Sequence, residues 1–175
     1  MNANSCLIGS LIEELMEVYK LDTLMEETRQ LASKYRDATG QPLPVSHDLA
    51  CYDAMRHLNL KTPEKPEASV DAVGPEVLGG QKFQIKGRVQ FSNLKGKQQR
   101  IGQLNLDGNW DICLLVLLNE AYQAEEMLAA DKETIQEAIG DKKVNKRGAM
   151  TVSQFRIVAE TIWEAEEDDL IQQDD

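Results

Sequence analysis

An aspartate, a glutamine and a lysine stand in a stretch whose pattern is typical of a β-hairpin. Asp71 ends a short β-prone run, and in a second run Gln84 and Lys86 alternate with the apolar residues Phe83 and Ile85. Alternation with period 2 predicts a half-buried strand, and the Gly-Pro turn between the runs allows them to pair. If they pair, the three polar side chains can converge at one end of a sheet. An acid, a second oxygen ligand and a lysine so placed can hold a divalent cation and a water beside a phosphate.

The same spacing also fits an ordinary hairpin with two surface polar residues and a solvated lysine. The distribution of charge bears on this choice. The net charge is −11, with seven acids and no base at positions 164–175, yet positions 81–100 contain six basic residues and no acid. Because the local field at a site decides which ligand it attracts, an acidic protein does not exclude an anionic partner.

Basic side chains in two regions are candidates for contacting the phosphates of DNA. They follow the second run of the hairpin and recur in a loop near position 145. The candidates are Arg88, Lys95, Lys97, Arg100, Lys143, Lys146 and Arg147. Phosphate contacts give affinity without sequence specificity. Each loop alone also fits a solvated surface, but their joint presence around the hairpin favours phosphate binding.

Length and cysteine usage restrict the class of protein. A chain of 175 residues suits one domain with a substantial core. The cysteines Cys6, Cys51 and Cys113 are far apart and show no metal-ligand spacing, which suits a reducing, cytoplasmic compartment. The longest apolar run, 112–118, is too short to span a bilayer, so we expect no membrane partner.

Helical periodicity dominates the N-terminal part of the chain. Residues 5–37 carry an apolar stripe, and Asp22 or Thr23 can cap a second helix within this range. We therefore expect a helical segment at 1–40. Its stripe packs either on the rest of the chain or on a second copy, which would give a homodimer.

The hairpin is predicted to lie between helices and one central strand. Ser46 is expected to be the N-cap of a helix that carries Asp48, and we interpret the neighbouring His47 as a capping or surface residue. The almost wholly apolar run 110–118 predicts a central strand covered on both faces. Residues 122–128 fit either a strand or a short helix.

Two further helices are expected towards the C-terminus. One spans 129–139 with Asp131 as its N-cap, and the last spans 151–163. The whole predicts an α/β (α+β) fold, a small mixed sheet flanked by helices, in a domain at 41–165 with an acidic tail at 166–175.

The motif Asp71…Gln84-Ile85-Lys86 resembles that of the PD-(D/E)XK nuclease superfamily. The longer pattern Phe-Gln-Ile-Lys-Gly-Arg, followed by the apolar run 110–118, is similar to small bacterial proteins described only as restriction-endonuclease-like or of unknown function. The resemblance covers roughly residues 45–163 and leaves the N-terminal helical segment unexplained. It implies a restriction endonuclease-like fold.

The resemblance also implies a site and a reaction. Asp71 would bind Mg²⁺ or Mn²⁺, Gln84 would stand where the superfamily usually has an acid, and Lys86 would be the motif lysine. Asp48 lies where many members place an additional acid. The implied activity is metal-dependent hydrolysis of DNA phosphodiester bonds, of restriction or defence type, by a homodimer. Gln84 departs from the pattern, because an amide brings only a neutral oxygen to the ion.

Two other functions are compatible with the same residues. One is a catalytically weak or inactive nuclease-fold protein that binds nucleic acid or a protein partner, which the neutral Gln84 and the net acidity favour. The other is an interaction protein in which the N-terminal helices dimerise and the sheet is only a scaffold.

Overall fold

The computed structural model describes residues 3–76, 79–92, 99–140 and 150–166, with side chains from residue 20 onwards. The chain divides into two compact units, Met1–Leu43 and Pro44–Asp175. Some candidate phosphate contacts lie outside the described residues. These are Lys95, Lys97, Lys143, Lys146 and Arg147.

The first unit contains a single long helix, α1, which runs from Ala3 to Thr39. The predicted second helix start at Asp22 or Thr23 is therefore wrong. No glycine or proline interrupts the chain at that point, so its residues continue the helix. Gly40 follows the last helical residue with a positive φ of 69°, and its N–H donates a hydrogen bond to the Arg36 carbonyl that closes the last turn.

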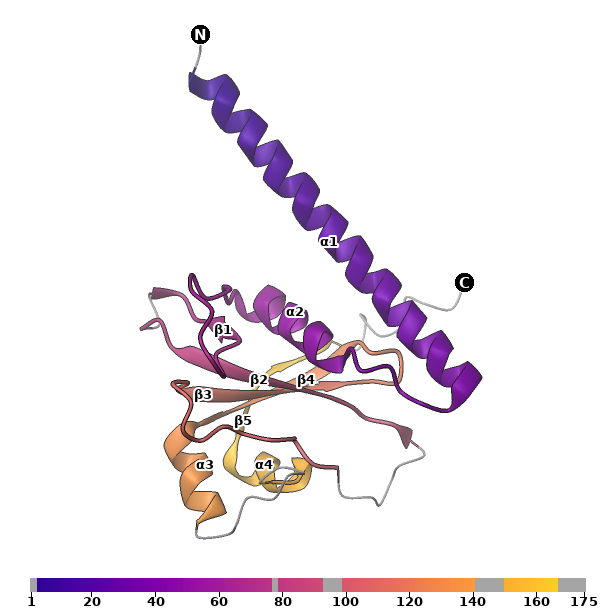
Figure 1. Ribbon diagram of the computed structural model, residues 1–175, viewed down its shortest axis with the longest axis vertical. Coiled ribbons are helices and arrows are strands. Elements are labelled where there is room, and N and C mark those ends of the chain that lie inside the picture. The colour runs from indigo at the N-terminus through magenta and orange to yellow at the C-terminus, as the bar shows by residue number, and fades with distance from the viewer. Residues whose placement is uncertain (1–2, 77–78, 93–98, 141–149, 167–175) are drawn as a thin grey trace. The chain divides into compact units, whose positions relative to one another are not determined.

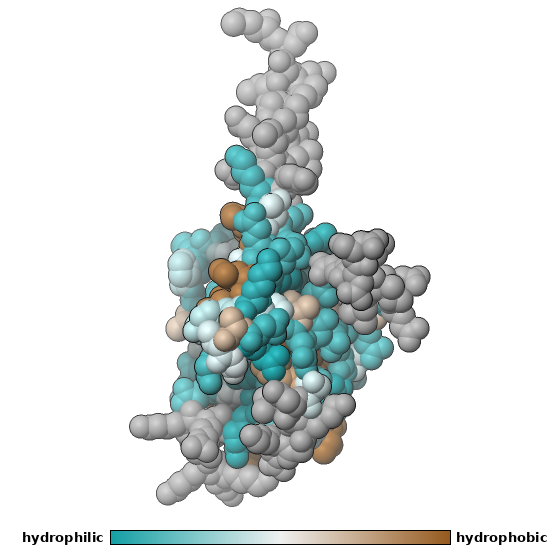
Figure 2. All heavy atoms as spheres, turned by 90° about the vertical axis from the view of Figure 1, so that its right-hand side faces the viewer, coloured by the Kyte–Doolittle hydropathy of each residue, from teal (hydrophilic) through white to brown (hydrophobic). Residues whose placement is uncertain are grey.

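The face shown in Figure 2 is mostly hydrophilic, with isolated hydrophobic side chains. Leu24 and Leu31 of α1 are 57% and 61% exposed. No helix among the described residues is long and apolar enough to cross a membrane.

The second unit is built on a five-stranded mixed sheet of order β1-β2-β3-β4-β5 among the described residues (Figure 1). β2 and β3 are parallel, and every other neighbouring pair is antiparallel. The strands are β1 (Ala72–Val73), β2 (Lys82–Val89), β3 (Ile112–Leu118), β4 (Ala124–Asp131) and β5 (Glu160–Glu164). The predicted α+β class, the hairpin and the central strand are confirmed.

Helices cover both faces of this sheet. Helix α2 (Ser46–Leu58) lies on one face, and α3 (Lys132–Ile139) and α4 (Val152–Val158) lie on the other (Figure 1). On the α3–α4 face, Ile135 and Phe155 join Leu115 of β3 in one buried cluster. Burial on both faces explains why β3 is almost wholly apolar.

Two predicted helix starts are wrong, although one predicted cap is right. Val45, not Ser46, is the N-cap of α2, and it makes no side-chain cap bond. The Asp131 carboxylate accepts a hydrogen bond from the Thr134 N–H at 2.8 Å, as expected of a cap. Ala129 and Ala130, however, belong to β4, because ladder pairing with β3 overrides the helical preference of alanine.

The last predicted helix is also wrong beyond Val158. α4 begins with a capping box between Thr151 and Gln154, ends at Val158, and is followed by β5. The free edge of β4 provides unpaired backbone groups, and the β-prone residues 161–163 satisfy them. The Glu126 carboxylate of β4 accepts hydrogen bonds from Arg156 in α4 and from the Thr161 hydroxyl in β5.

Gly87 sets how closely α2 lies on the sheet. A Cβ at this position would stand 2.1 Å from the Ser46 carbonyl oxygen and 2.7 Å from the Ala50 Cβ. The backbones of α2 and β2 therefore approach each other so closely that no side chain fits between them. This approach fixes the first turns of α2 against the middle of β2.

Gly87→Ala is expected to lower the free energy of unfolding by about 1–3 kcal/mol, because the new methyl group forces α2 away from β2. Urea unfolding measures the change. Gly74→Ala is the matched control, since its Cβ would meet no atom closer than the Phe83 ring at 3.3 Å. Equal stability of the two variants would contradict the close-contact explanation.

Candidate functional site

The Asp71 carboxylate is fixed at the edge of β2. The two residues of β1 pair only with Lys82 and Phe83, so the edge of β2 beyond Phe83 has no strand partner in the described structure. The Asp71 N–H donates to the Phe83 carbonyl at 2.8 Å, and Asp71 Oδ2 accepts from the Ile85 N–H at 2.7 Å. One carboxylate oxygen thus continues the ladder of the strand that carries the motif, and the other remains for a ligand.

Gln84 is the polar residue of the motif that lies deepest. Its side chain is 3% exposed, and its Oε1 atom has no hydrogen-bond partner among the described residues. In the parallel register Gln84 lies beside Cys113 of β3. Leaving a buried acceptor unpaired costs about 1–3 kcal/mol. A polar atom kept at this cost is available for a ligand.

Lys86 lies half-buried two residues further along β2. Within the described structure its ammonium makes no hydrogen bond or ion pair. Burial raises the pKa of Cys113 to about 12, and Lys86 and Asp71 act on that thiol in opposite directions. Both charges also act on the thiol of Cys51. Asp71 and Lys86 therefore influence the same two thiols, although no direct bond joins them.

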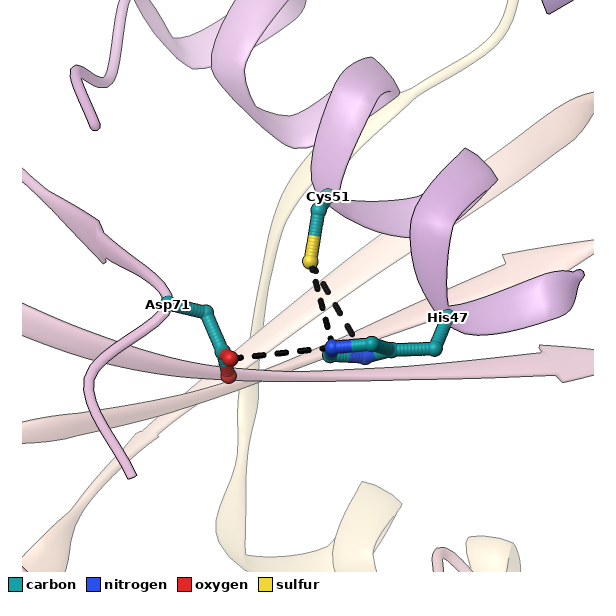
Figure 3. A group of neighbouring side chains, drawn as sticks. All are labelled: His47, Cys51 and Asp71. Carbon is teal, nitrogen blue, oxygen red and sulfur yellow. Dashed lines mark hydrogen bonds and ion pairs between the residues drawn. The ribbon is translucent and has the colours of Figure 1, made fainter. Parts of the chain in front are cut away.

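Two residues that were not predicted as site residues complete the surroundings of Asp71. His47 and Cys51 project from α2 towards the Asp71 carboxylate (Figure 3). His47 Nε2 lies 3.6 Å from Asp71 Oδ1, and Cys51 Sγ lies 3.8 Å from the same nitrogen. One nitrogen, one sulfur and one oxygen atom lie within 4.8 Å of one another.

These three side chains are not arranged for nucleophilic catalysis by cysteine. Burial raises the pKa of Cys51 to about 12, and the charges of Asp71 and Asp48 add to the effect. The thiol is therefore protonated at neutral pH, whereas thiolate is the nucleophile. Sγ is also almost equidistant from both ring nitrogens of His47, at 3.8 and 3.9 Å, so it lies against the ring and not along one N–H direction.

The remaining predicted ligand, Asp48, is exposed in the first turn of α2. Its negative charge adds to the raised pKa of Cys51. Among the described residues, however, it is not a member of the cluster around Asp71. Its role as a metal ligand stays a prediction.

The two predicted phosphate-binding arginines that the structure describes contact protein groups. Arg88 Nε donates to the Arg100 carbonyl at 2.7 Å, and its Nη1 donates to the Gly87 carbonyl. Burial lowers the pKa of Arg88. The backbone of Arg100 forms a bridge with Thr151. Arg88 thus ties β2 to the segment that follows it, and phosphate binding by either arginine stays a prediction.

The sequence contained one signal for the missed residues. His47 and Cys51 are four positions apart, and this spacing places both on one face of a helix. The spacing between the cysteines carries no such signal, and Asp71 lies far along the chain. No protein-family model and no curated protein matches this chain. The chemistry of the site therefore rests on its residues alone.

Asp71→Asn is expected to lower the pKa of Cys51 and so to speed its alkylation, because the substitution removes a negative charge that opposes the thiolate. A fall of about one pKa unit corresponds to roughly tenfold more thiolate and a proportionate gain in rate at pH 8. Iodoacetamide labelling, read by mass spectrometry of the Cys51 peptide, measures the rate. Asp107→Asn is the matched control, because Asp107 is not among the charges that act on the Cys51 thiol. An unchanged rate at Cys51 would contradict the assigned coupling.

Proposed function

We propose that this chain is a Mg²⁺- or Mn²⁺-dependent endonuclease of the PD-(D/E)XK type that hydrolyses DNA phosphodiester bonds. One observation carries the proposal. The motif strand holds a buried amide oxygen without a partner in the described structure, at Gln84, and the Asp71 carboxylate is bonded to the next residue of the same strand. Lys86, two residues further along the same strand, would supply a positive charge.

The donor types suit a hard cation. Mg²⁺ binds through oxygen, takes few protein ligands and keeps several waters. Asp71 and Gln84 would hold the ion, and Asp48 remains a candidate third ligand. The bound ion supplies Lewis-acid activation of a phosphoryl oxygen and of a water. With one carboxylate and one neutral amide, we expect weaker binding of the metal than two acids would give.

Lys86 has two roles open to it. Its ammonium can stabilise the negative charge that develops on the phosphate, and this role requires no change of its pKa. Alternatively, a neutral Lys86 can take a proton from the attacking water, which requires a lowered pKa. Cutting both DNA strands needs two sites, so the proposal includes a homodimer. The exposed Leu24 and Leu31 of α1 offer apolar surface for such a contact.

A non-catalytic nuclease-fold protein that binds nucleic acid is the second candidate. The observation that favours it is Gln84, which brings no charge to the ion where the superfamily usually has an acid. The two functions differ in a measurable way, because only the nuclease needs the ion and Lys86 for its effect on DNA.

Asp71→Ala and Lys86→Ala are each expected to reduce Mg²⁺-dependent cleavage of plasmid DNA at least about 100-fold, since each removes a group that stabilises the transition state. Gel electrophoresis of supercoiled plasmid measures cleavage. Lys82→Gln is the matched control on the same strand, because Lys82 pairs with Glu67 at 2.7 Å and lies at the other end of the hairpin. Metal-independent DNA binding by the wild type, without cleavage, would select the second candidate.

Two substitutions of Gln84 test the ion directly through stability. Gln84→Met is expected to raise the free energy of unfolding by about 1 kcal/mol, because it removes an unpaired buried acceptor. Gln84→Glu is expected to lower it without metal, because a charge is then buried, and to regain stability when Mg²⁺ is added. Thermal unfolding with and without Mg²⁺ measures both effects. A Gln84→Glu protein that ignores Mg²⁺ would contradict a cation site at this position.

A further inference from the structure

The donor atoms around His47 differ in kind from those of a magnesium site. They are an imidazole nitrogen, a thiol sulfur and a carboxylate oxygen, and they come from α2 and from the residue before β1. Mg²⁺ does not select sulfur or nitrogen ligands, whereas Zn²⁺ takes all three types. We propose that His47 Nε2, Cys51 Sγ and Asp71 Oδ1 form a site for Zn²⁺ or a similar transition-metal ion, with a fourth position open to solvent.

The observed distances are close to those that such an ion needs. Tetrahedral bonds of about 2.0–2.3 Å to zinc place neighbouring ligand atoms about 3.3–3.7 Å apart. His47 Nε2 lies 3.6 Å from Asp71 Oδ1 and 3.8 Å from Cys51 Sγ. The third pair, Sγ and Oδ1, lies within 4.8 Å, so binding requires the imidazole to turn until Nε2 faces both atoms. Figure 3 shows the three side chains gathered in one place.

The scaffold holds each ligand in place before any ion binds. Ser46 and Ala50, which Gly87 contacts so closely, immediately precede the two helix ligands. On the other side, the Ile85 N–H holds Asp71 Oδ2 and leaves Oδ1 directed at the ring of His47. Hydrogen bonds of this kind orient metal ligands, and their loss typically lowers metal affinity about 10–100-fold.

The site is open to an ion from solution. The side chain of His47 is 52% exposed and that of Asp71 is 24% exposed. A protein site with three ligands and one open position is the arrangement of catalytic zinc sites, whereas structural sites use four protein ligands. A water or a small anionic ligand would therefore take the fourth position.

The site shares Asp71 with the proposed magnesium site. Zinc bound there would occupy the Asp71 carboxylate, so it would inhibit Mg²⁺-dependent cleavage. This consequence rests on the proposed nuclease function, but the site itself does not.

Cobalt substitution tests the site without any activity assay. Titration of the full-length, metal-free chain with Co²⁺ is expected to produce the near-ultraviolet charge-transfer band of a thiolate–cobalt bond. Cys51→Ser should abolish the band, and His47→Gln should weaken Co²⁺ affinity at least tenfold. Cys113→Ala and Cys6→Ser are the matched controls and should keep the band. No band in the wild type, or a band that survives Cys51→Ser, would overturn the proposal.

A second measurement needs no variant and so does not depend on how the variants fold. Zn²⁺ is expected to protect Cys51 of the wild type from slow alkylation at raised pH, and a chelator should reverse the protection. Equal labelling with and without Zn²⁺ would overturn the site. Failure of the nuclease proposal would appear instead as DNA that stays intact with Mg²⁺ while the cobalt band and the zinc protection are present.

Discussion

The hydrogen bond from the Ile85 N–H to Asp71 Oδ2, at 2.7 Å, is the interaction on which the candidate site depends. β1 is too short to cover the edge of β2, so one exposed backbone donor of that edge would lack a protein partner. The carboxylate accepts the hydrogen bond that the backbone of a longer β1 would otherwise accept. Because the bond is charge-assisted, it is stronger than a bond between neutral groups. It holds an acid between the motif strand and α2, and both proposed metal sites use that acid.

The close approach at Gly87 is the matching constraint on the helix side. Without a Cβ at this position, the first turns of α2 lie directly on β2, and His47 and Cys51 come within reach of Asp71. A glycine within a strand often marks such an approach of two backbones. The site is therefore a product of packing between α2 and the hairpin, and a larger residue at this position would separate its two halves.

Asp71 belongs to two proposed metal sites whose other ligand atoms differ in kind. On the β2 side the proposed nuclease site adds the oxygen of Gln84 and the charge of Lys86, which suit a hard cation and a phosphate. Towards α2 its neighbours are a nitrogen and a sulfur, which suit a softer ion. An ion bound in either site uses the Asp71 carboxylate that the other site requires, so the two ions would compete. Such competition would make the availability of zinc a control on the proposed nuclease.

Features that depend on a local pattern of residues could be predicted from the sequence. Alternation at residues 82–86 and the apolar run 112–118 identified β2 and β3, and Asp131 was recognisable as a cap because its bond to Thr134 spans three positions. Tertiary structure decided the rest. β5 forms only because β4 offers a free edge, and the burial of Gln84 follows from its place beside β3. His47 and Cys51 join Asp71 through a contact across the fold, and no local pattern contains that distance.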